Sequence, residues 1–154
     1  MKKIFASALF LMAAFIVKAQ DTSSYVLLKK YYTIKEALVS GEAKQAAGSA
    51  TEFADKISKL NAGTVDAVSV KKLWAEATAI ADAKDLEKQR EAFSEFSEDM
   101  YQLAKKTRLG SANIYRQYCP MKKMYWLSAE TTIRNPYYGS MMLSCGKVVE
   151  TIKP

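Results

Sequence analysis

The absence of proline from the first 119 residues is the feature that most constrains how this chain folds. Proline lacks a backbone N–H and breaks helices, so a long stretch without it can be helical throughout. All three prolines and both cysteines lie after Gly110. We therefore divide the chain into a helical region over residues 20–110 and a second region over residues 111–154.

Apolar residues recur at helical spacing through residues 20–110. Leu27, Tyr31, Ile34 and Leu38 are separated by four, three and four positions, which places them on one face of a helix. We expect a serine at position 23 or 24 to cap this helix and Ser40-Gly41 to end it. Similar patterns predict three more helices: one from Ala43 to Leu60; one capped by Thr64 that carries Val65, Val68, Leu73, Trp74, Ala77 and Ile80; and one capped by Asp85 that carries Leu86, Phe93, Phe96, Met100 and Leu103 and closes at Leu109-Gly110.

Four helices with short connections predict a mainly α fold, an up-down antiparallel four-helix bundle. After Gly110, β-branched and aromatic residues in Ile114–Tyr118 and Val148–Ile152 predict short strands, with turns at Asn135-Pro136 and Tyr138-Gly139 between them. We expect these residues to form a small irregular or two-stranded cap on the bundle, within a single domain over residues 20–154.

Residues 1–19 have the pattern of a signal peptide. A basic start at Lys2-Lys3 precedes an apolar run that ends with small residues before Ala19, so we expect cleavage there and export to the periplasm or beyond. The run is too short to span a membrane, and no second long run follows it. Cleavage would lower the net charge from +7 to +4, with 20 basic and 16 acidic side chains remaining. That charge is too small and too dispersed for a nucleic-acid footprint.

The chain contains no histidine. This excludes Ser-His and Cys-His catalysis, His-ligated zinc sites and imidazole pH switches. The sequence also lacks a Gly-rich phosphate loop, and its carboxylates are expected on solvated helix faces. We therefore expect a binding or interaction protein without a cofactor of the usual enzymatic kinds, and no enzymatic activity.

Sulfur is concentrated in two segments of the cap, 118–126 and 141–146. Each cysteine has a methionine nearby, and thiolate and thioether ligands favour soft ions, Cu(I) above all. Cys119, Met121, Cys145 and either Met141 or Met142 would complete a Cu(I) site. Zinc is a poorer fit, because without histidine it would need carboxylates to complete its tetrahedron.

A disulfide between Cys119 and Cys145 is the alternative interpretation. Cysteine pairs in exported proteins commonly form disulfides, and closing this loop would stabilise the fold by about 3.5 kcal/mol. The methionines would then pack against aromatic rings. In that case the cap would be a protein-interaction module that docks on another envelope protein.

Several strings of the chain closely resemble a bacterial family of exported domains of unknown function. The strings are Tyr118-Cys119-Pro120-Met121, Tyr125-Trp126-Leu127-Ser128, residues 133–139, Met142-Leu143-Ser144-Cys145-Gly146, and parts of 31–39 and 85–93. Members of this family also occur at the C-terminus of the adaptor subunits of CusB-type heavy-metal efflux pumps.

The resemblance implies a link to copper or another soft heavy metal. By position, Cys119, Met121, Met142 and Cys145 match the sulfur residues of the family motif, whereas Met124 and Met141 have no clear place in it. Because this chain lacks the adaptor portion, the resemblance implies a free-standing carrier or buffer, with a heavy-metal efflux component as a possible protein partner.

Overall fold

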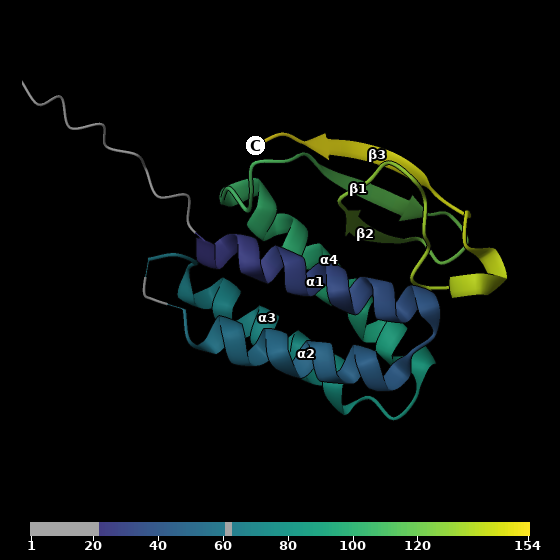
Figure 1. Ribbon diagram of the computed structural model, residues 1–154, viewed down its shortest axis with the longest axis horizontal. Coiled ribbons are helices and arrows are strands. Elements are labelled where there is room, and N and C mark those ends of the chain that lie inside the picture. The colour runs from purple at the N-terminus through teal and green to yellow at the C-terminus, as the bar shows by residue number, and fades with distance from the viewer. Residues whose placement is uncertain (1–21, 61–62) are drawn as a thin grey trace, which may run out of the picture.

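The computed structural model describes residues 22–60 and 63–154 and contains four helices followed by a small antiparallel sheet (Figure 1). The helices are α1 (Thr22–Ser40), α2 (Ala43–Ser58), α3 (Ala67–Asp82) and α4 (Leu86–Lys106). The mainly α fold predicted from the sequence is confirmed. The expected signal peptide lies outside the described residues.

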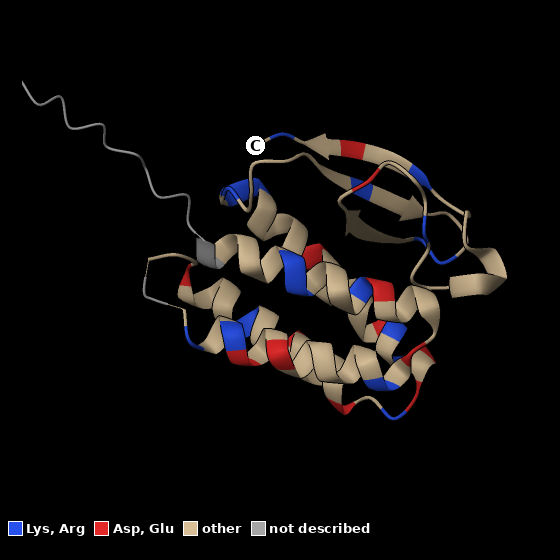
Figure 2. Ribbon diagram, in the orientation of Figure 1, with Lys and Arg blue, Asp and Glu red and all other residues tan. Residues whose placement is uncertain are grey.

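The elements stack in three layers. Each helix packs against the next in sequence, as an up-down bundle requires. Helices α2 and α3 form one layer, and α1 and α4 form the next (Figure 1). The sheet covers the side of α1 and α4 that faces away from α2 and α3 (Figure 1). Basic and acidic side chains are interspersed along the helices (Figure 2). Among the described residues, no helix has the length and apolar content that crossing a membrane requires.

The predicted stripe of α1 forms the centre of the core. Leu27, Tyr31, Ile34 and Leu38 are all fully buried, as their spacing indicated. Other helices add aromatic rings around Tyr31, whose ring stacks on that of Phe93 with 5.2 Å between centroids. Aromatic contacts of this kind contribute about 0.5–1.5 kcal/mol each beyond burial.

Helix boundaries differ from the prediction at three points. Asp66, not Thr64, caps α3, because its carboxylate accepts from the backbone N–H of Ser69 at 2.9 Å. The serines at positions 23 and 24 lie inside α1 rather than at its start. Helix α4 ends at Lys106, three residues before Leu109. The Asp85 cap of α4 is confirmed, since its side chain accepts from Lys88 N at 2.9 Å.

Two apolar residues assigned to the buried face of α3 are exposed. Val68 has 68% of its surface exposed and Trp74 has 46%, whereas Leu73, Ala77 and Ile80 are fully buried. Successive helical residues are rotated by about 100°, so Trp74 lies well away from the stripe that Leu73 defines. The prediction that Trp74 is buried was wrong because it counted apolar residues along α3 without asking whether they share one face of the helix.

The cap is a three-stranded sheet. Its strands are β1 (Ile114–Cys119), β2 (Met124–Ser128) and β3 (Lys147–Ile152), arranged antiparallel in the order β2-β1-β3. The two predicted strands are confirmed as β1 and β3, and β2 is one strand more than expected. A tight turn at residues 120–123 joins β1 to β2, with Lys123 in the left-handed region at φ 56°.

Arg116 attaches the sheet to α4. Its guanidinium lies 3.7 Å from the ring centroid of Tyr101 on α4 and 4.1 Å from that of Tyr125 on β2. The same group forms a 2.6 Å ion pair with Glu98. A guanidinium held between two rings and a carboxylate gives the cap a fixed orientation on the bundle.

Candidate functional site

A buried hydroxyl connects the cap to the centre of the bundle. The Tyr31 hydroxyl accepts a 2.9 Å hydrogen bond from the backbone N–H of Leu127 and lies 2.8 Å from Ser97 Oγ, to which it can donate. Leu127 lies on β2, the edge strand, so Tyr31 satisfies an outward-facing amide that the sheet leaves unpaired. Burial raises the pKa of Tyr31 well above its usual value, which keeps the hydroxyl protonated.

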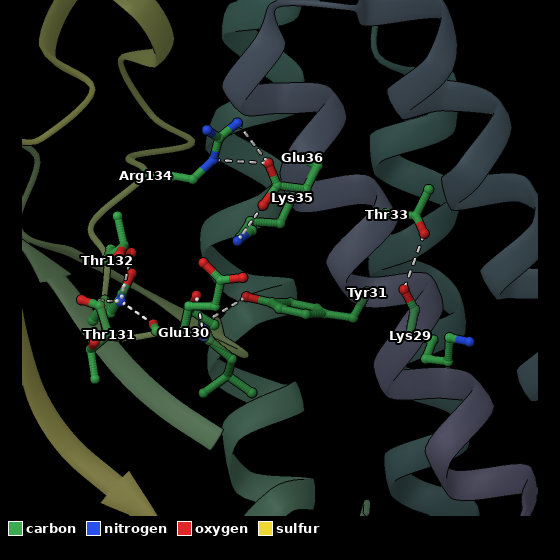
Figure 3. A network of polar contacts seen from close by, with 12 residues as sticks. Lys29, Tyr31, Thr33, Lys35, Glu36, Glu130, Thr131, Thr132 and Arg134 are labelled. Atoms are coloured by element: carbon green, nitrogen blue, oxygen red, sulfur yellow. Dashed lines mark hydrogen bonds and ion pairs between the residues drawn. The ribbon is translucent and has the colours of Figure 1, made fainter. Parts of the chain in front are cut away.

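A group of three charged side chains fixes the segment after β2 (Figure 3). Glu36 on α1 accepts from Lys35 at 2.6 Å through one carboxylate oxygen and from Arg134 at 3.0 Å through the other. Although partial burial acts to raise it, the two cations lower the pKa of Glu36. The carboxylate therefore stays ionised and ties the segment to α1 at neutral pH.

Gln117 fixes the same segment from the sheet side. It is fully buried on β1, and its Nε2 donates at 2.8 Å to the backbone oxygen of Glu130. The carbonyl oxygens of Thr131 and Thr132 lie 3.3 Å from the same nitrogen (Figure 3). Three successive carbonyls thus converge on one amide, which holds an irregular stretch against β1.

Asn135 holds the loop that carries the second cysteine, and the predicted turn beside it is confirmed. It is fully buried, and its side chain accepts from Tyr137 N at 2.9 Å and donates to the Cys145 carbonyl at 2.7 Å. Its backbone N–H donates to Leu143 O at 2.8 Å. These bonds join the turn to residues 143–145, ten positions later, and so fix the position of Cys145.

The structure brings the two cysteines together. Cys119 is the last residue of β1 and fully buried, while Cys145 precedes β3 and is partly exposed. Tyr118 pairs with Lys147 in the sheet, which places Cys145 beside the end of β1, close enough for the two thiols to interact electrostatically. Both are free thiols in this structure.

Gly146 permits this close approach. A Cβ at this position would lie 2.9 Å from the backbone oxygen of Tyr118 and 2.9 Å from the Trp126 ring, and the residue has φ 152°. A side chain would collide with both groups. Glycine is therefore required for the chain to pass directly beside β1 and place Cys145 against Cys119.

The environment of Cys145 favours its protonated thiol. Desolvation, together with the charge and hydrogen bond of Cys119, raises the pKa of the Cys145 thiol. A metal ion bound here must displace protons, because only the thiolate is a good ligand. Binding at this site would accordingly strengthen as the pH rises.

The four predicted ligands differ in position. Met121 lies in the turn between β1 and β2 with 62% of its surface exposed, and Met142 ends the short helix η1 (Gly139–Met142) with 37% exposed. Met124, which was not among the four predicted ligands, lies directly opposite Cys119 in the β1–β2 ladder. A hairpin register drawn across the turn at 120–123 would have revealed this pairing.

Hard ligands do not complete the site. Among the residues that the structure describes, no three Cys, Asp or Glu side chains are grouped to hold a metal, and the chain has no histidine. Methionine thioethers are the other soft side-chain donors in the cap, at positions 121, 124, 141 and 142. That donor set suits Cu(I) and does not suit zinc, calcium or magnesium.

The fold and the thiol pair define a small helical-bundle domain with a dithiol cap. A family model described as protein of unknown function (DUF3347) matches residues 27–112, and the chain belongs to this family. The match covers nearly all of the bundle and ends before the sulfur residues of the cap. No curated protein and no solved structure matches the chain.

Proposed function

We propose that this protein is an exported binding protein, not an enzyme, for Cu(I) or a similar soft ion. Cys119 and Cys145 supply the thiolates, and the protein acts as a carrier or buffer linked to heavy-metal efflux. The observation that supports this most strongly is that the strand pairing of Tyr118 with Lys147 and the close approach at Gly146 bring together two thiols that lie 26 positions apart in sequence. Two adjacent thiolates can hold a low-coordinate soft ion without any further ligand.

The surroundings of the pair are suited to Cu(I), which must be kept from water and oxidants. Cys119 has none of its surface exposed, and Trp126 beside the pair is 1% exposed. Cys145 is partly exposed, so an ion held between the two sulfurs would be reachable from one side. Met121 and Met142 at the surface are available to assist transfer to a partner.

The framework around the pair is formed by protein contacts. Asn135 fixes Cys145 through its carbonyl, and Cys119 belongs to a strand paired on both sides. The cap should therefore stay folded without metal, so that loss of a ligand reduces binding without unfolding the bundle. This distinguishes a binding site from a structural metal site.

The test is an anaerobic Cu(I) titration of reduced protein, residues 20–154, against a chromophoric Cu(I) chelator. Wild type should bind one equivalent, and Cys145→Ser should lose tight binding while its helical circular dichroism is retained. Ser144→Ala is the matched control at the neighbouring exposed position and should bind as wild type does. Unfolding of the Cys145→Ser bundle would instead indicate a structural cysteine.

Cys119 is tested with alanine, because serine would place a hydroxyl at a fully buried position. Cys119→Ala should also lose tight binding. If either single variant binds Cu(I) as tightly as wild type, the two-thiolate site is wrong.

A protein-interaction module with a Cys119–Cys145 disulfide is the second candidate. The proximity of the two thiols favours it equally, since a disulfide needs two cysteines that are close in space. Met121, Met141 and Leu143 also leave an apolar surface on the cap, with 62%, 74% and 38% of their area exposed. This candidate predicts that reduction lowers the melting temperature, and that added Cu(I) has no specific effect.

A further inference from the structure

A hollow of about 270 Å³ lies at the outer edge of β2 beside the first turns of α4. The residues that line it include two methionines, Met124 on β2 and Met141 on η1. Neither of them was among the four ligands predicted from the sequence. The fold thus places both in one cavity, although they are 17 positions apart in sequence.

Met124 occupies the inner end of the hollow. It pairs directly with Cys119 in the antiparallel ladder. Side chains of directly opposed residues project from the same face of a sheet, with Cβ atoms about 4.5–5.5 Å apart. Met124 is therefore positioned next to the buried thiol, whereas Met121 lies in the exposed turn.

Tyr137 forms a wall that the hollow shares with the thiol pair. It lines the hollow, is 3% exposed, and packs edge-on against Trp126. The Trp126 ring, 6.0 Å from the Tyr137 ring between centroids, lies against the backbone of Gly146, the residue after Cys145. The hollow consequently adjoins the cysteines on their α4 side.

Exposure decreases along the sulfur residues from the surface inward. Met141 is 74% exposed at the mouth of the hollow, Met124 is partly buried, and Cys119 is fully buried. The charged side chains that line the hollow balance, since Glu87 and Glu91 face Arg90 and Lys122. A hard divalent cation gains little from such a lining, so the two thioethers set the preference for a soft ion.

We propose that this hollow is a thioether site for a soft monovalent ion, which Met141 and Met124 hold before it passes to Cys119 and Cys145. The onward transfer rests on the proposed function, but the thioether site itself does not. Met124, and not Met121, is then the methionine that delivers the ion to the thiols.

The thioether site is tested by NMR of protein labelled with ¹³C at the methionine methyl groups. Ag(I) serves as a soft probe that is inert to oxidation, and it is titrated past the first equivalent, which the thiols take up. The Met124 and Met141 signals should shift together with one midpoint, while fully buried Met100 stays unchanged as an internal control. Methionine-to-leucine variants assign the signals.

The two proposals fail separately in this experiment. If the cysteines bind Ag(I) but Met124 and Met141 shift no earlier than exposed Met121, the thioether site is wrong and the thiol site stands. If Met124 and Met141 shift together while Cys145→Ser changes no metal binding, the thioether site stands and the thiol site is wrong.

A kinetic measurement tests the route. Met124→Leu should slow Cu(I) uptake from a donor complex several-fold without changing the final stoichiometry, and should slow it more than Met121→Leu, since the proposed function gives Met121 a part in release to a partner. Slow uptake in Met121→Leu beside normal uptake in Met124→Leu would overturn the assignment.

Discussion

The bond between Tyr31 and the edge strand allows a sharp test of how the cap is held. In Tyr31→Phe the ring keeps its place among Phe93 and Phe96, so only the hydroxyl is lost. Two interactions disappear with it, the 2.9 Å bond from Leu127 N and the 2.8 Å bond to Ser97 Oγ. The substitution therefore isolates the polar link between the bundle and the sheet.

The expected cost follows from burial on both sides of the link. The Leu127 amide is buried and donates to Tyr31, and a buried N–H that is left unsatisfied costs about 1–3 kcal/mol. The bond with Ser97 contributes about 1 kcal/mol more. We expect Tyr31→Phe to lose about 2–4 kcal/mol, which at about 3 °C per kcal/mol lowers the melting temperature by about 6–12 °C.

Chemical denaturation of Tyr31→Phe beside Ser97→Ala gives the measurement. Ser97→Ala removes one bond but leaves the Leu127 amide paired with Tyr31, so it should cost only about 1 kcal/mol. The double variant should cost less than the sum of the two, because the residues share a bond. A Tyr31→Phe variant within 1 kcal/mol of wild type would refute this reasoning.

Two further predictions concern the cap and the bundle. Gly146→Ala should destabilise the protein by more than about 1 kcal/mol in denaturation and should slow oxidation of the thiol pair. The control is Gly48→Ala in α2, which should be neutral or stabilising because no atom lies within 4 Å of the added Cβ. Equal effects at the two glycines would contradict the close approach seen at Gly146. Burial, together with neighbouring Asp99, raises the pKa of Glu76 to about 8, which is above the value in the unfolded chain. The stability that protonated Glu76 provides is therefore complete at acidic pH and is lost as the pH rises through 8. Glu76→Gln should therefore raise the melting temperature at pH 9 more than at pH 5, and a gain independent of pH would count against the shift.

The bundle was predictable because its signals are local. Leu27, Tyr31, Ile34 and Leu38 specify a buried helix face by spacing alone, and Asp85 marks a helix start by its own side-chain chemistry. The cap of α3 was placed at Thr64 because Thr64 and Asp66 are both good capping residues near the same boundary. Only packing decided that Asp66 would cap the helix.

The site was predictable in its residue types but not in its arrangement. The sequence singles out Cys119 and Cys145 as candidates, yet their contact depends on a long-range strand pairing and on the absence of a side chain at Gly146. Strand β2 was missed, and with it the position of Met124 opposite Cys119. Spacing in sequence favoured Met121, which the turn at 120–123 places at the surface.

X-ray absorption at the copper edge tests the central claim most directly. The sample is reduced protein loaded anaerobically with one equivalent of Cu(I) and washed free of excess metal. The account predicts that the wild type retains copper with a first shell of sulfur alone, and that Cys145→Ser loses its copper in the same wash. A first shell of nitrogen or oxygen in the wild type, or copper lost completely from the wild type in the wash, would contradict it.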